Sequence, residues 1–265
     1  MARGSGETGG LAEEYLGGKT TVPLLDPGIV DQLVAENALV HVGSRSLDGR
    51  VVERLPDVVK QLIEFSDVFN KSRFPQQKAE AREQMFQIKR GFGNSSVLKE
   101  ALIRYVIRAQ PGGVDPTEPG TLDDRLPMSH RNNFIFHLHS DICNRLKVED
   151  PSLVRWYSAI GTPLDHLFGT DGFFVADGQA FPDGRRRLLP VDITTNTSKV
   201  DGYREEGTDS SQPVMRYDSL LLPVGDFEGD DIRDLSDHFA GQVAQVFGRS
   251  SPDRSLEGFR LEEEA

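Results

Sequence analysis

The sequence predicts an α/β protein with a helical N-terminal half and a second half in which helices flank a mixed β-sheet. Between residues 21 and 109, apolar residues recur at helical spacing, whereas from residue 153 short apolar runs alternate with turn signals. Residues 110–129 hold four prolines and several glycines, so this stretch is the expected linker between the halves. With 265 residues, the chain is long enough to bury a sizeable core.

Four helices are expected in the first half. Asp26 is a candidate N-cap with Pro27 in the first turn, and the second helix is expected to begin near Pro56. The four expected ranges are 26–39, from about 56 to before Pro75, 76–90 and 97–108. The last of them carries an apolar stripe at positions i, i+3, i+4, i+7 and i+8, formed by Leu98, Ala101, Leu102, Tyr105 and Val106. The basic residues of this region are expected on the helix surfaces.

The second half is expected to alternate helix, strands and helix. A helix is predicted over 130–147, a β-like run over 153–160, a hairpin within 169–199, a strand-like run over 214–224 and a final helix over 230–247. The predicted organisation is therefore a flexible N-terminus (1–20), a helical region (21–109), a linker (110–129), an α/β core (130–247) and an acidic tail (248–265).

Cysteine content and hydropathy favour a cytoplasmic protein. Cys143 is the single cysteine of the chain, which excludes an internal disulfide and fits a reducing compartment. No apolar run approaches the roughly 20 residues needed to cross a bilayer, and the first residues lack the hydrophobic core of a secretion signal. We therefore expect no membrane partner.

The charge of the chain is unevenly distributed. The net charge is −12, yet residues 71–110 carry nine Lys or Arg against three Glu, and residues 201–265 carry sixteen Asp or Glu against six Arg. A separate basic segment is compatible with a polyanionic ligand even in an acidic protein. A solvated helix face balanced by an acidic tail is the alternative interpretation.

The stretch 169–199 carries the chemistry of the sequence. Asp171 opens one apolar run, Asp192 interrupts the next, and turn signals lie between them. Strand alternation places Asp192 and Thr194 on one face and the more apolar set Leu189, Val191 and Ile193 on the other. If Asp171 lies opposite Asp192, the two carboxylates can share a hard cation such as Mg²⁺ or Mn²⁺, which activates water and stabilises a phosphoryl transition state.

Asp171, followed after twenty residues by Asp192 in an apolar strand and preceded by a helix bearing a carboxylate, resembles the PD-(D/E)xK, or restriction-endonuclease-like, nuclease superfamily. The resemblance covers roughly residues 130–247. It implies a mixed sheet flanked by helices and cleavage of DNA or RNA with Mg²⁺ held by Asp171 and Asp192. It also implies a lysine that helps to position or activate the water.

The position of that lysine departs from the family pattern. Thr194 stands two residues after Asp192, where the lysine is expected, and Lys199 is the candidate replacement. Threonine supplies no cation. A non-catalytic structural or interaction protein with a degenerate nuclease-like domain is therefore the alternative function.

The helix preceding the hairpin offers further candidate ligands. Helical spacing groups His137, Asp141 and Asn144 along one edge of that helix. In the nuclease interpretation Asp141 assists in metal binding, with His137 as its partner. A different class of site also fits, in which His137, Asp141 and His166 bind a transition metal.

The helical region is the expected surface for DNA or a protein partner, and a homo-oligomer is a further alternative. The candidate nucleic-acid-binding residues are Lys71, Arg73, Lys78, Arg82, Lys89 and Arg90. Phosphate contacts by such residues predict binding that weakens steeply with salt.

Overall fold

The computed structural model describes residues 25–39, 49–110, 134–194, 213–216, 219–224 and 232–249. The chain divides into two compact units. Of the described residues, 134–158, 171–194, 213–216, 219–224 and 232–249 form one, which we call the sheet unit. The remainder, 25–39, 49–110 and 159–170, form the helical unit. The short segment 159–170 thus groups with the helices, although the sequence placed it inside the α/β core.

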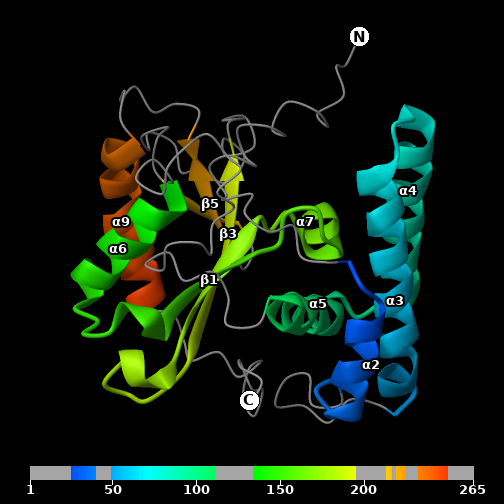
Figure 1. Ribbon diagram of the computed structural model, residues 1–265, viewed down its shortest axis with the longest axis horizontal. Coiled ribbons are helices and arrows are strands. Elements are labelled where there is room, and N and C mark those ends of the chain that lie inside the picture. Colours follow the sequence, from blue (N-terminus) through cyan, green and yellow to red (C-terminus); the bar gives the residue numbers. More distant parts are fainter. Residues whose placement is uncertain are drawn as a thin grey trace. The chain divides into compact units, whose positions relative to one another are not determined.

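The helical unit contains the four helices expected from the sequence and one short additional helix (Figure 1). These are α2 (Gly28–Ala35), α3 (Gly49–Lys71), α4 (Pro75–Phe92), α5 (Ser95–Ala109) and α7 (Pro163–Phe168). The Asn94 side chain accepts a hydrogen bond from Val97 N and caps α5. Asp26 lies one residue further from α2 than predicted, since Pro27 is the N-cap, but its carboxylate still accepts from Gly28 N at 2.8 Å.

The predicted start of α3 at Pro56 is wrong, because the helix begins at Gly49 and Pro56 lies inside it. A proline inside a helix removes a hydrogen bond and costs about 3 kcal/mol or more. Leu55 is fully buried beside the proline, and Val59 and Leu62 continue the same buried face. We attribute the longer helix to this apolar burial, which offsets the local penalty.

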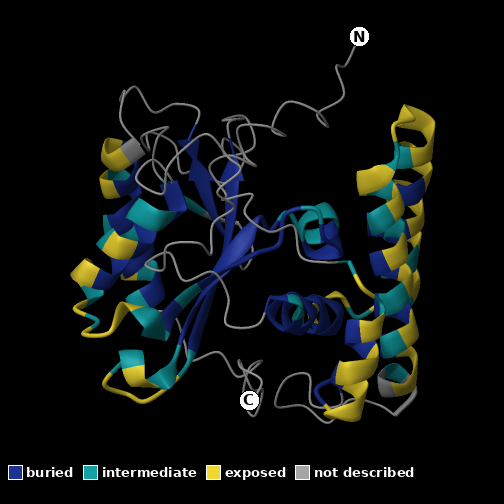
Figure 2. Cartoon of the chain, viewed as in Figure 1, coloured by how far each residue is buried: buried dark blue, intermediate teal, exposed yellow. Residues whose placement is uncertain are grey.

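Helix α5 is buried along most of its length, as Figure 2 shows. The predicted apolar stripe is confirmed, and Tyr105 OH accepts a hydrogen bond from Asp26 N at 2.9 Å. The expectation that basic residues lie on the surface is wrong here, because Lys99, Arg104 and Arg108 are buried. Arg104 donates to the Ala38 carbonyl and Arg108 forms an ion pair with Glu36, so both join α5 to the end of α2.

The sheet unit contains one five-stranded mixed sheet of order β1-β2-β3-β5-β4. Its strands are β1 (Val154–Ser158), β2 (Gly172–Ala176), β3 (Arg187–Thr194), β4 (Val214–Arg216) and β5 (Ser219–Pro223). The β2–β3 pair is antiparallel, which confirms the predicted hairpin, and β3 pairs with β5 in parallel. The single run predicted over 214–224 is instead two antiparallel strands. The protein is therefore mixed α/β, as predicted.

Helices α6 (Phe134–Leu146) and α9 (Ile232–Arg249) pack against one face of the sheet (Figure 1). The rings of Phe134 and Phe239 meet edge to face between them, with centroids 6.3 Å apart. The sheet contributes alternate residues to this core, including Trp156, Phe174, Leu189, Val191, Ile193, Leu220 and Leu222. Among the described helices none is long and apolar enough to cross a membrane.

Candidate active site at the end of the β2–β3 hairpin

Asp171 and Asp192 lie next to each other where the β2–β3 ladder ends. The last paired residues are Gly172 and Val191; Asp171 directly precedes the first and Asp192 directly follows the second. Both are buried, with 8% of Asp171 and 3% of Asp192 exposed. The structure thus brings together the two aspartates that the sequence placed on neighbouring strands.

Asp171 is held by the backbone of β3 on both sides of Asp192. Its amide donates to the Val191 carbonyl at 2.9 Å, and its Oδ2 accepts from Ile193 N at 2.6 Å. A hydrogen bond from a backbone N–H to a carboxylate is charge-assisted and stronger than a neutral one. The carboxylate of Asp171 therefore fastens the end of the hairpin and is fixed in orientation beside Asp192.

Asp192 faces away from the α6–α9 core. Leu189, Val191 and Ile193 point into that core, so by alternation Asp192 and Thr194 point to the opposite face. This is the arrangement that strand alternation predicted. Thr194 is fully buried, and the two residues pair with Leu221 and Pro223 of β5. A carboxylate buried in a central strand is costly unless hydrogen bonds, an opposite charge or a cation compensates it.

Gly172, between Asp171 and Phe173, fixes the position of the hairpin against β1. A Cβ atom at Gly172 would overlap Trp156 Cζ2 and lie 2.8 Å from Cε2 of the same ring. The indole, whose centroid is 4.7 Å from that of Phe174, therefore lies directly over the glycine backbone. Sequence reasoning missed this residue, although a glycine inside a strand is a known sign of close approach.

Asp141 belongs to a different environment from the aspartate pair. Its Oδ2 accepts a hydrogen bond from Ser236 Oγ at 2.8 Å, which joins α6 to α9. Both helices cover the sheet face opposite to the one that carries Asp192. Within the described part of the chain, no three or more His, Cys, Asp or Glu side chains are grouped so as to hold a metal. Lys199 lies outside the described residues, so its relation to the pair is untested.

The alternative site of His137, Asp141 and His166 is likewise not formed as a metal-binding group among the described residues. His166 lies on α7 in the helical unit, where its ring packs against Phe69 with centroids 4.5 Å apart. Its Nε2 is 3.3 Å from Asn70 Oδ1. Burial, with the nearby charges of Arg82 and Lys78, lowers the pKa of His166 to about 4, so it is neutral at pH 7.

The six candidate nucleic-acid-binding residues fall into different environments. Lys71 pairs with Asp67 at 2.7 Å, and Arg90 pairs with Glu83 at 3.6 Å. Lys89 donates to the Leu167 carbonyl at 2.7 Å, and burial together with the charge of Lys99 lowers its pKa. These three side chains therefore have partners within the helical unit.

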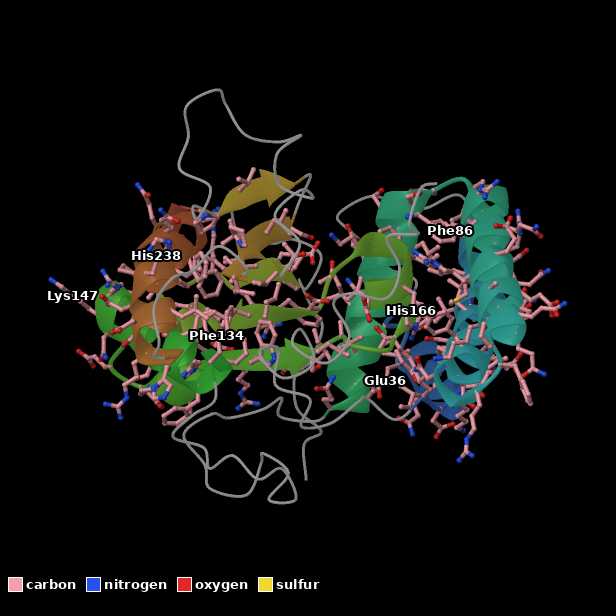
Figure 3. The ribbon with its side chains drawn as sticks, turned by 90° about the horizontal axis from the view of Figure 1, so that it is seen from above. Glu36, Phe86, Phe134, Lys147, His166 and His238 are labelled. Atoms are coloured by element: carbon pink, nitrogen blue, oxygen red, sulfur yellow. The ribbon has the colours of Figure 1, made fainter. Side chains whose placement is uncertain are left out.

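The other three are more available for a ligand. Arg73 and Arg82 are exposed and Lys78 is half-buried. Lys78 Nζ lies 5.5 Å from the centre of the Phe69 ring, and the Arg82 guanidinium lies 5.8 Å from that of Phe86. Figure 3 labels Phe86 on α4 and His166 on α7.

The arginines at the hairpin tip have a structural explanation. Arg187 donates to the carbonyls of Phe247 and Gly248 at the end of α9 and pairs with Asp183 at 2.8 Å. A cation at the C-terminal end of a helix interacts favourably with its dipole. Arg186 lies 3.7 Å from Asp177. These contacts account for two of the three consecutive arginines without a phosphate ligand.

Comparison with family models, with curated proteins and with solved structures found no match to this chain.

Proposed function

We propose that the protein is a metal-dependent nuclease of the PD-(D/E)xK type, which hydrolyses phosphodiester bonds in DNA or RNA. The observation that carries the proposal is the adjacency of Asp171 and Asp192, both buried, at the end of the β2–β3 hairpin. The mixed sheet with two helices packed on one face is compatible with the restriction-endonuclease-like core that this class uses.

The aspartate pair suits a hard divalent cation. Two buried carboxylates at neighbouring positions repel each other, and a cation bound between them relieves that repulsion. Mg²⁺ is commonly bound by one or two carboxylates, with water molecules as its remaining ligands. Asp171 and Asp192 would hold Mg²⁺ or Mn²⁺, which would activate water and stabilise the charged phosphoryl group.

Other residues have defined parts in the proposal. The hydrogen bond from Ile193 N keeps Asp171 oriented without reorganisation when substrate binds. Lys199 is the proposed cationic residue, since Thr194 at the usual position of the lysine carries no charge. Asp141 is left out of the metal site, because it lies on α6, which covers the sheet face opposite to Asp192.

A second candidate function is a non-catalytic interaction protein built on a degenerate nuclease-like domain. Two observations favour it. Thr194 is fully buried in the position of the expected lysine, and the described residues hold no group of three metal ligands. In this case the aspartate pair would serve only to fasten the hairpin.

A plasmid-nicking assay with Mg²⁺ or Mn²⁺ separates the two functions. Asp192→Asn keeps the shape of the side chain and removes its charge, whereas Asp234→Asn makes the same change on the exposed side of α9. We expect Asp192→Asn to lower the nicking rate at least ~100-fold, in keeping with the loss of a residue acting on transition-state charge, and Asp234→Asn to leave it unchanged. Equal nicking by the wild type and Asp192→Asn, with both folded by circular dichroism, would exclude the nuclease function.

A further inference from the structure

The turn between α3 and α4 presents an aromatic side chain to solvent. Phe74, the N-cap of α4, is 65% exposed, more than any other large hydrophobic side chain in the described part of the chain. Leaving a Phe side chain in water forgoes the favourable free energy of burying it. A lone exposed apolar residue needs no explanation by itself, so the surroundings of Phe74 decide its meaning.

The turn is fixed by hydrogen bonds rather than by packing of the ring. Ser72 Oγ accepts from Phe74 N at 3.1 Å and lies 2.8 Å from Gln77 Oε1, which ties the turn to the first turn of α4. Pro75 at the first helical position restricts the backbone further. Phe74 is therefore held outward by a preorganised backbone, which reduces the entropy lost when it contacts a ligand.

The charge around Phe74 is positive. From residue 68 to residue 79 the chain carries Lys71, Arg73 and Lys78 and no carboxylate. Lys71 is paired with Asp67, but its side chain remains 77% exposed. Arg73, the residue before Phe74, is exposed.

Cations and aromatic rings continue at four-residue spacing along α4. Lys78, Arg82 and Phe86 follow the N-cap Phe74 at four-residue spacing, so each lies one turn beyond the last, although the row drifts around the helix by about 40° per step. Lys78 Nζ also lies near the Phe69 ring of α3. The Arg82 guanidinium lies over the Phe86 ring. Proteins bind the backbone and the bases of single-stranded nucleic acids by combining cations with aromatic rings in this way.

We propose that Phe74 stacks on an unpaired base of a nucleic acid strand, while Arg73, Lys78 and Arg82 contact the phosphates on either side. The nature of the ligand rests on the proposed nuclease function. The positive charge favours a polyanion over an apolar protein partner. The exposed ring can stack only on a base whose flat face is not already stacked on another base. Duplex DNA stacks its bases internally and offers such a face only where it is unpaired, so single strands bind more tightly than duplex.

Fluorescence anisotropy of a labelled single-stranded oligonucleotide tests the stacking, with the full chain in EDTA so that no cleavage occurs. Base–aromatic stacking contributes about 1–3 kcal/mol per base, so Phe74→Ala should weaken binding of the single strand by ~10-fold or more. The matched control is Val68→Ala, which truncates another exposed apolar residue of the helical unit (47% exposed) and should change binding less than ~2-fold. Phe74→Trp should retain the affinity of the wild type, and its fluorescence should be quenched on binding.

The phosphate contacts have a separate readout. Each phosphate contact to a single strand contributes about 0.7 to the slope of log K against log salt. The double variant Lys78→Gln, Arg82→Gln should therefore reduce that slope by about 1.4, whereas Phe74→Ala should leave the slope unchanged.

The outcomes distinguish this proposal from the nuclease proposal. If Phe74→Ala binds the single strand as tightly as the wild type, the stacking role is excluded. That result is expected if Phe74 instead contacts a protein partner. Nicking that depends on Asp192 would then still support the nuclease. If the wild type binds neither single-stranded nor duplex oligonucleotide, the nucleic-acid contact at α4 is excluded as well.

Discussion

The helical unit and the sheet unit each bury an arginine against an acidic residue, but the sheet unit also buries two aspartates at neighbouring positions. In the helical unit, Arg108 is buried against Glu36, a residue of opposite charge, and Arg104 donates to a carbonyl. In the sheet unit, Asp171 and Asp192, two residues of like charge, are buried side by side. Opposite charges that pair with each other have a structural explanation, whereas adjacent like charges repel and need hydrogen bonds, a cation or a proton to compensate them. A buried charge beside an opposite charge is therefore explained by the fold, whereas a buried charge beside a like charge is the one that points to a functional site.

The position of Asp171 depends on the β2–β3 hairpin. We expect a side chain at Gly172 to disturb that hairpin more than any other single substitution. Gly172→Ala should destabilise the protein by about 3 kcal/mol, because the added methyl group overlaps the buried Trp156 ring. Gly91→Ala in α4 is the matched control, since nothing lies within 4 Å of its added Cβ, and should raise stability by up to about 1 kcal/mol. Urea unfolding measures both. A Gly172→Ala protein as stable as the wild type would show that the ring moves aside at little cost.

The helical unit also buries His166, which stays neutral at pH 7, whereas the sheet unit buries two acidic residues. The stability of the helical unit should therefore depend on pH through His166. The folded-state pKa of His166 is about 4 against 6.5 for an exposed histidine. The unfolded state therefore binds more protons between these pH values, and stability is lost as the pH falls through this window. Asp165, Lys78 and Arg82 are the charged groups around the ring.

Between pH 7 and pH 5 this linkage should cost the wild type about 2 kcal/mol of unfolding free energy. His166→Gln should lack that part of the pH dependence while keeping the loss that comes from other groups. Urea unfolding at the two pH values measures the difference. Equal losses in wild type and variant would mean that His166 titrates normally in the folded protein.

Replacing one of the two like charges tests the comparison directly, with the smallest expected effect. Without metal, Asp192→Asn should stabilise the protein by about 1 kcal/mol if repulsion by Asp171 outweighs the other interactions of Asp192. Added Mn²⁺ should raise the melting temperature of the wild type but not that of the variant. Differential scanning fluorimetry in EDTA and in Mn²⁺ gives both measurements. A variant that melts below the wild type in EDTA would assign Asp192 a structural role like that of Glu36.

Local patterns in the sequence were sufficient for most individual elements. The apolar stripe of α5, the Asn94 cap and the β2–β3 hairpin were predictable, because helical periodicity, capping and strand alternation act over a few residues. The same alternation placed Asp192 and Thr194 on the face away from the core. Pro56 misled the prediction, since the burial of Leu55 and Val59 extends α3 through the proline.

The sequence by itself determined the α/β class, most of the helices, the β2–β3 hairpin and the two aspartates on neighbouring strands. Only the tertiary structure decided which charges are buried and what they meet. It placed Arg108 against Glu36, Arg187 against the end of α9, and Asp141 against Ser236. It also packed Trp156 over Gly172, beside Asp171. These contacts join residues far apart in the chain, and their free energy depends on burial and neighbouring charge, which no local pattern encodes.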